Sequence, residues 1–119
     1  KNIKLPVSAP FHCDLMSDAT KIMKNELNKI DFKIGQNKLI SNVTASEIEN
    51  LEDLKKLLIQ QIESRVRWRE SIINMINSKV NQFIEIGPGK VLSGLVKRIN
   101  RNVKIDTINS QSDIEGLKI

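Results

Sequence analysis

Aromatic residues are scarce in this sequence of 119 residues, which has three phenylalanines, one tryptophan and no tyrosine. Proteins bind single-stranded nucleic acids largely by stacking bases on aromatic side chains, so this scarcity argues against a nucleic-acid partner. Cys13 is the one cysteine, which excludes an internal disulfide and a zinc site of the usual four-ligand kind and favours a reducing compartment. No apolar run approaches the roughly 20 residues that a membrane-spanning helix needs, so we expect no membrane span.

The charge is unbalanced toward the basic side, with 19 Lys and Arg against 14 Asp and Glu, a formal net charge of +5. Such a surface attracts nucleic acid, an anionic membrane surface or an acidic protein. Hydrophobic residues make up 39% of the chain, which is typical of a globular domain or a piece of one. The sequence opens with Lys1 and no leader, so we expect a portion of a longer protein.

Apolar periodicity predicts helices that alternate with short strands. Prolines favour an extended segment at residues 5–12. Three-to-four spacing of apolar residues predicts helices, each with one buried face, at 14–30, 51–62, 66–80 and 91–99. Short apolar runs predict strands at 39–43, 83–86 and 103–108, before a polar tail. The alternation indicates an α/β fold with a mainly parallel sheet.

His12 is the only histidine, and it lies between the extended segment and the first predicted helix. Ligand sites in α/β proteins form at such strand-to-helix corners, and an imidazole exchanges protons near neutrality. By position alone, His12 is either a proton-transfer residue or a corner residue that only hydrogen-bonds its neighbours. The adjacent Cys13 is interpreted as a buried structural cysteine, because a nucleophile and its base need side-chain contact.

Two further motifs admit both a structural and a functional interpretation. Residues 87–90, Gly-Pro-Gly-Lys, lack the spacing of a phosphate-binding loop and are interpreted as a tight turn, with Ser93 and Gly94 permitting close packing of the next helix. Amides at the start of that helix could still attract an anion. The three arginines of residues 65–69 flank Trp68, either as an anion or partner site or as solvated residues at a helix start.

Four segments in order resemble the malonyl-CoA:acyl carrier protein transacylases. They are residues 5–16 (LPVSAPFHCDLM), 40–45 (ISNVTA), 61–72 (QIESRVRWRESI) and 83–99 (FIEIGPGKVLSGLVKRI). The resemblance implies that residues 1–119 are the C-terminal portion of an acyltransferase domain, within its hydrolase-like subdomain. It also implies an enzyme of fatty acid biosynthesis that moves a malonyl group from CoA to the phosphopantetheine thiol of acyl carrier protein through an acyl-serine intermediate.

The resemblance assigns roles to particular residues. His12 would be the catalytic base and acid, oriented by a backbone carbonyl at Gln61, and Phe11 would border the acyl pocket. Basic residues near the last predicted helix would dock the acidic carrier protein, with Lys97 seven residues after Lys90 and Arg101 extending the stripe if the helix continues; the set is Lys90, Lys97, Arg98 and Arg101. No metal and no permanently bound cofactor is implied, and malonyl-CoA is the substrate.

The sequence also departs from the family. Arg65 replaces the usual proline, and no Gly-x-Ser-x-Gly nucleophile elbow occurs. The family carries that serine, the arginine for the malonyl carboxylate and a small ferredoxin-like subdomain in its N-terminal part, so we expect this chain alone to be inactive. The alternative hypothesis is a basic interaction module without catalysis. A transacylase would be cytoplasmic in a bacterium and lie in a plastid or mitochondrion in a eukaryote.

Overall fold

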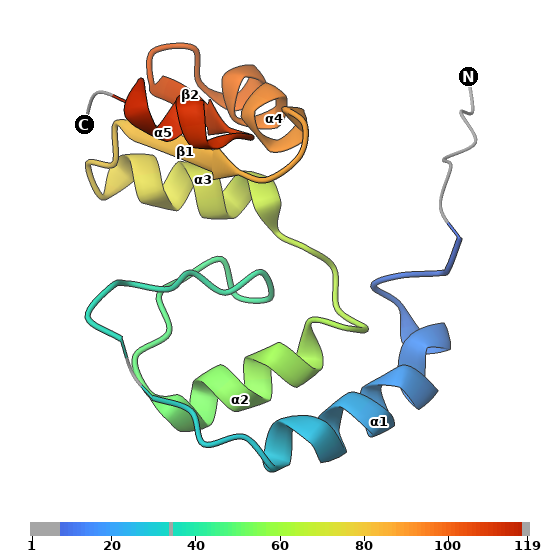
Figure 1. Ribbon diagram of the computed structural model, residues 1–119. Helices are drawn as coiled ribbons and strands as arrows, with labels where there is room; N and C mark the ends of the chain where they lie inside the picture. Colours follow the sequence, from blue (N-terminus) through green and yellow to red (C-terminus); the bar gives the residue numbers. More distant parts are fainter. Residues whose placement is uncertain (1–7, 34, 118–119) are drawn as a thin grey trace. The chain divides into compact units, whose positions relative to one another are not determined.

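The structure is a computed structural model that describes residues 8–33 and 35–117 (Figure 1). It divides into two compact units, one up to Trp68 and one from Arg69 onward. Residues 5–7 of the predicted extended segment lie outside the described residues, and residues 8–12 form bends and a turn. Among the described residues, no helix combines the length and apolar character needed to cross a bilayer.

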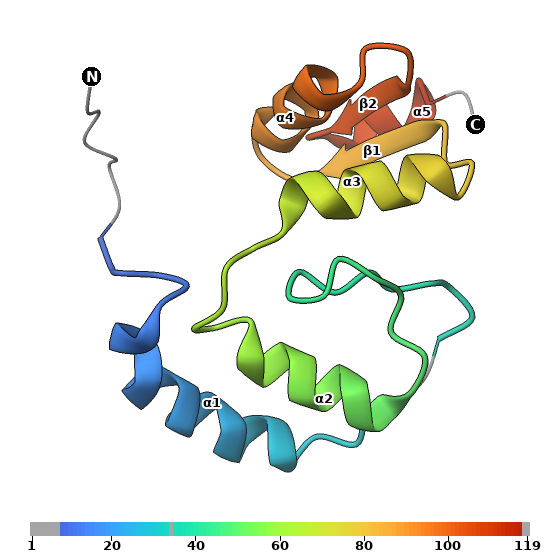
Figure 2. The ribbon, with the colours of Figure 1, turned by 180° about the vertical axis from the view of Figure 1, so that it is seen from behind.

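The first unit is built on two helices that lie side by side (Figures 1 and 2). A 3-10 turn, η1 (Asp14–Met16), leads into α1 (Ser17–Asn28), and α2 spans Leu51–Gln60. The side chain of Asn50 accepts a hydrogen bond from the Asp53 amide at 2.8 Å, a capping contact that starts α2 where the sequence predicts a helix. On α1, Leu27 is buried, but Ile22 is 65% exposed, so the predicted buried face is largely open in this chain.

The predicted strand at 39–43 is wrong, since only an isolated antiparallel bridge joins Ile40 to Glu47. The buried Ser41 hydroxyl accepts hydrogen bonds from the amides of Val43 at 3.1 Å and Thr44 at 3.4 Å. The Ser41 carbonyl takes the Ala45 amide at 2.9 Å, and Ala45 has a φ of 59°. These local bonds turn the backbone out of an extended conformation, because a side chain that satisfies nearby amides competes with a strand ladder.

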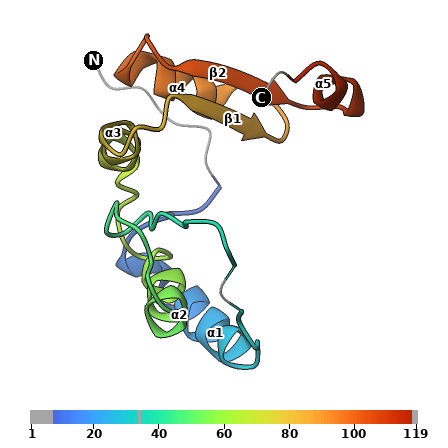
Figure 3. The ribbon, with the colours of Figure 1, turned by 90° about the vertical axis from the view of Figure 1, so that its left-hand side faces the viewer.

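The second unit is a parallel β-α-β arrangement (Figure 3). Helix α3 (Trp68–Asn77) precedes β1 (Gln82–Ile86), which pairs in parallel with β2 (Lys104–Ile108) in a register from Gln82–Lys104 to Ile86–Ile108. Helix α4 (Val91–Ile99) connects the strands and packs against both. Two apolar side chains, Ile72 of α3 and Val96 of α4, are buried. The predicted strands and crossover helix are therefore confirmed.

The predicted polar tail contains a short helix, α5 (Gln111–Glu115), which packs on β2. A capping box starts it: Asp113 accepts hydrogen bonds from the Ser110 amide and hydroxyl, both at 2.9 Å. The Asp113 carboxylate also takes the Asn109 amide at 2.9 Å. The pattern Ser110-x-x-Asp113 is a sequence signal for the start of this helix, although the sequence analysis predicted only a polar tail.

Candidate active site

His12 lies in a turn and makes two hydrogen bonds to the residues that directly follow helix α2. Its backbone amide donates to the Ile62 carbonyl at 3.2 Å, and its ring Nδ1 lies 2.8 Å from the Gln61 carbonyl oxygen. The last carbonyls of a helix have no partner within the helix, so His12 satisfies acceptors that would otherwise need water. Its φ of 62° is left-handed, which is uncommon for a residue other than glycine.

The contact with Gln61 decides how the His12 ring can react. A carbonyl oxygen only accepts hydrogen bonds, so Nδ1 carries the hydrogen and, in the neutral ring, Nε2 keeps its lone pair. Because the side chain is exposed, a reacting group can approach Nε2. The arrangement is that of a general base held in one tautomer by an acceptor at its other nitrogen.

Asn42 is part of this cluster, although sequence reasoning gave it no role. Its side-chain amide donates to Gln61 Oε1 at 3.2 Å, while its backbone carbonyl accepts from the Arg67 amide at 2.9 Å. The Arg67 guanidinium donates to the Thr44 carbonyl at 3.3 Å. This half-buried arginine therefore helps to hold the first unit together, which favours the structural interpretation of that segment.

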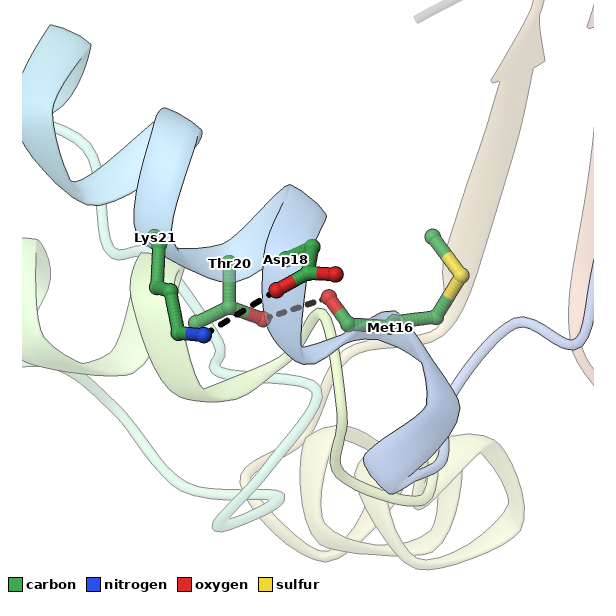
Figure 4. Close-up of polar contacts among 4 residues, drawn as sticks. All are labelled: Met16, Asp18, Thr20 and Lys21. Atoms are coloured by element: carbon green, nitrogen blue, oxygen red, sulfur yellow. Dashed lines mark hydrogen bonds and ion pairs between the residues drawn. The ribbon is translucent and has the colours of Figure 1, made fainter.

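The segment after His12 is fixed by local contacts. The Met16 amide donates to the Cys13 carbonyl at 3.0 Å. The Thr20 hydroxyl donates to the Met16 carbonyl at 3.2 Å (Figure 4). Lys21 and Asp18 form an exposed ion pair at 3.0 Å beside them. The Cys13 thiol donates to the Pro10 carbonyl at 3.1 Å, while the His12 ring bonds Gln61, and Cys13 is half-buried rather than buried. Cys13 and His12 therefore do not form a nucleophile pair.

The glycine turn between β1 and α4 is closed by the protein's own polar groups. Glu85 accepts hydrogen bonds from the amides of Leu92 at 3.1 Å and Ser93 at 2.7 Å, and Asn109 Oδ1 accepts from the Gly89 amide at 2.8 Å. The nearby Ser93 hydroxyl, followed by the hydrogen bonds from the amides of Ser93 and Leu92, lowers the pKa of Glu85. A carboxylate already occupies the amides that an anion would use, which supports the structural interpretation of this turn.

The predicted basic stripe differs from the structure in one respect. Lys90 precedes α4, Lys97 and Arg98 lie exposed in its last turn, and Asn100 ends the helix in extended backbone. Arg101 thus lies beyond the helix and does not extend a helical stripe, because the helix does not continue. Lys90 also has a nearby acidic group, since its charge contributes to lowering the pKa of Asp113, after larger contributions from the Asn109 amide and the Ser110 hydroxyl.

Phe11, the predicted pocket residue, precedes His12 directly and is 57% exposed. More than half of its surface is therefore accessible in the described part of the chain. Whether that surface borders an acyl group remains a prediction.

Comparisons with known proteins identify relatives along nearly the whole chain. No protein-family model matches it. A malonyl CoA-acyl carrier protein transacylase from Bacillus subtilis is 46% identical over 113 residues, which cover 95% of this chain and 36% of that protein. An acyl-carrier-protein S-malonyltransferase structure from Bartonella henselae aligns with a TM-score of 0.88 and 44% identity, over 94% of this chain and 36% of that one.

A third relative was solved with a partner. The structure of a type II PKS acyl-carrier protein in complex with its malonyl-transacylase aligns with a TM-score of 0.86 and 33% identity, over 93% of this chain and 36% of the matched chain. The chain thus spans about a third of the length of the relatives that it matches. Its α/β fold is that of the corresponding part of these structures.

Proposed function

Because this chain is homologous to part of the malonyl CoA-acyl carrier protein transacylases, we propose that it is the C-terminal portion of such an acyltransferase and supplies its catalytic base. The observation that carries the proposal is the 2.8 Å contact between His12 Nδ1 and the Gln61 carbonyl. It leaves Nε2 as the proton acceptor, which is the form of histidine that a serine nucleophile requires.

The proposed reaction uses His12 four times as a proton carrier. Nε2 takes the hydroxyl proton of a serine from outside this sequence while the serine oxygen attacks the thioester carbonyl of malonyl-CoA. The carbon–sulfur bond breaks, and the imidazolium returns the proton to the CoA sulfur. The phosphopantetheine thiol of the carrier protein then gives its proton to Nε2 while its sulfur attacks the carbonyl carbon of the malonyl-serine ester. The ester carbon–oxygen bond breaks, and the proton passes back to the serine oxygen.

Gln61 serves each of these steps in the same way. Its carbonyl accepts the Nδ1 hydrogen whether the ring is neutral or protonated, so the imidazole keeps one orientation through the cycle. No step changes an oxidation state, so we propose no permanently bound cofactor. The chain alone lacks a serine elbow and is expected to be inactive without the remaining part of the enzyme.

The partner in this proposal is an acyl carrier protein, and the basic residues of the second unit are its proposed docking surface. The relative solved with a type II PKS acyl-carrier protein supports this choice. The exposed residues Lys97 and Arg98 carry the docking charge on α4. Lys90 directly precedes this helix in the sequence, and Arg101 follows it. Relatives in bacteria favour the bacterial alternative, in which the enzyme is cytoplasmic.

A chimera tests the proposal. In it, this chain replaces the aligned segment of the B. subtilis transacylase, and malonyl transfer from CoA to acyl carrier protein is measured. His12→Ala should lower kcat by about 10²- to 10⁴-fold, the range for loss of acid–base catalysis. His12→Asn is the matched control for folding, because its amide can donate to the Gln61 carbonyl but cannot act as a base.

We expect both variants to unfold at the temperature of the unsubstituted chimera and both to be inactive. Undiminished transfer by His12→Ala would remove His12 from the mechanism. A chimera that binds carrier protein without transferring malonyl would instead favour the alternative of a basic interaction module.

A further inference from the structure

Asn42 connects a rigid loop to the residue that orients His12. Its Nδ2 donates to Gln61 Oε1 at 3.2 Å, and the carbonyl of the same Gln61 accepts from His12 Nδ1 at 2.8 Å. Asn42 and Gln61 are 19 residues apart in sequence, and Gln61 and His12 are 49 apart. Three separate segments of the first unit therefore meet at Gln61, whose side chain contacts Asn42 and whose backbone carbonyl contacts His12.

We propose that Asn42 is a positioning residue, which fixes Gln61 and through it the orientation of the His12 ring. The inference rests on the proposed function for the catalytic consequence, but its structural part concerns only His12, Gln61 and Asn42. Asn42 does not touch the ring, so its action is indirect.

The loop that carries Asn42 is well suited to hold another residue in place. Ser41 and Ala45, which close the loop, are 5% and 1% exposed. The Ser41 hydroxyl and carbonyl accept three backbone amides of the loop, and the Asn42 carbonyl accepts the Arg67 amide at 2.9 Å. The backbone on both sides of Asn42 is therefore tied down, which fixes the position from which its side chain donates to Gln61 Oε1.

Gln61 lies at a helix end, so a contact that restrains its side chain has a larger effect there than within the helix. It is the C-cap of α2, and its carbonyl is among those that the helix itself leaves without a partner. Helix ends fray, so this carbonyl has more freedom than one within the helix. Fixing the Gln61 side chain restrains the rotation of its peptide groups and therefore the direction in which the carbonyl accepts the Nδ1 hydrogen.

Paired substitutions separate the hydrogen bond from side-chain volume. Asn42→Leu and Gln61→Leu each remove the amide contact, and Gln61→Leu leaves the backbone carbonyl in place. Asn42→Asp should restore the contact, because the Gln61 amide can turn and donate its Nε2 hydrogens to the new carboxylate. Asn25→Leu, at an exposed position of α1, is the matched control for the same change of side chain.

The first measurement needs no activity. His12 is the only histidine, so the ring-nitrogen NMR signals of the ¹⁵N-labelled 119-residue chain report one imidazole. We expect the Nδ1–H tautomer in the unsubstituted chain, in Asn42→Asp and in Asn25→Leu. We expect an increased share of the Nε2–H tautomer in Asn42→Leu and Gln61→Leu, with circular dichroism showing the same helix content in all of them.

The second measurement is transfer by the chimera. Asn42→Leu and Gln61→Leu should each lower kcat by about 10- to 100-fold, the cost of a displaced catalytic group, with KM for malonyl-CoA nearly unchanged. Since both act through one contact, the double variant should be no worse than either single variant.

Unchanged tautomer populations and an unchanged kcat in Asn42→Leu would overturn the inference, as would a double variant whose losses simply multiply. Failure of the proposed function is a different result: His12→Ala would then retain full transfer, whatever the tautomer measurement shows for Asn42.

Discussion

Two glycines of the second unit should respond in opposite ways to the same substitution. Gly89 lies in the turn between β1 and α4 with a φ of 97°, whereas Gly94 lies inside α4. A Cβ atom built at either position meets nothing within 4 Å in the described structure. Steric crowding is therefore equal at the two sites, and the backbone conformation alone decides the sign. The open space at Gly94 also means that the predicted close packing there is absent within the described residues.

The magnitudes follow from the backbone. An alanine at the Gly89 conformation costs about 1–3 kcal/mol of strain, offset by about 0.4–1 kcal/mol from the reduced freedom of the unfolded chain. Gly89→Ala should therefore lower the free energy of unfolding by about 1–2 kcal/mol. Gly94→Ala should raise it by roughly 0.5–1 kcal/mol, because glycine is that much poorer than alanine inside a helix.

Urea unfolding followed by circular dichroism at 222 nm measures both values on the same chain. The separation between the variants should be about 2–3 kcal/mol, well above the error in comparing midpoints at a constant slope. If both substitutions shift the midpoint in the same direction, the argument from backbone conformation is refuted. Both variants keep the backbone amide at position 89, which donates a hydrogen bond to Asn109 Oδ1. Loss of that hydrogen bond therefore cannot explain a difference in stability.

Three further predictions use the same chain or the chimera. The folded-state pKa of Glu85 is lowered, so its stabilisation is present above its ordinary pKa of 4.5 and is lost as pH falls below that value. Glu85→Gln should therefore be less stable than the unsubstituted chain at pH 7, with a gap that narrows in urea titrations toward pH 3; a constant gap would contradict this. Phe11→Ser should change the ratio of malonyl to methylmalonyl transfer by about 10- to 200-fold, the effect of one methyl group in an apolar pocket, and an unchanged ratio counts against a pocket role. Charge reversal of Lys97 and Arg101 together should raise KM for acyl carrier protein and flatten its salt dependence, while leaving transfer to a small thiol unchanged; equal effects on both acceptors would exclude docking.

The predicted elements that hold in the structure are those with strong local signals. The second helix begins where Asn50 caps it, and the parallel pair β1–β2 coincides with the two short apolar runs around the glycine turn. The strand expected at 39–43 fails because Ser41 bonds the amides that follow it, a competition that apolar patterning does not register. The helix at 111–115 was missed because a single apolar residue, Ile114, among four polar ones shows no apolar period, although Ser110 and Asp113 supply its capping box.

The candidate site shows a different limit. Position alone placed His12 at a corner but left its role open, since its partner Gln61 is 49 residues away in the sequence. Only the resemblance to a known family named that partner. Asn42 was invisible to both approaches, because one hydrogen bond between two surface amides leaves no periodic or compositional trace. Arg101 was placed on the basic stripe only on the condition that the last predicted helix continued, and the helix ends at Ile99.

The use of a helix end to orient His12 suits the proposed exchange of an acyl group between thiols. The Gln61 carbonyl is a neutral acceptor, where many serine hydrolases place a carboxylate beside the histidine. Cleavage of an amide must protonate a strongly basic leaving amine, whereas a thiol has an ordinary pKa of about 8.5 and departs more readily as its thiolate. In the acylation half of the proposed reaction, His12 therefore needs mainly a fixed direction at Nε2, whereas in the second half it also returns a proton to the serine oxygen. The Gln61 carbonyl at the end of α2 supplies that direction without an additional charge, and the proposed role of Asn42 is to restrain Gln61 through its side chain.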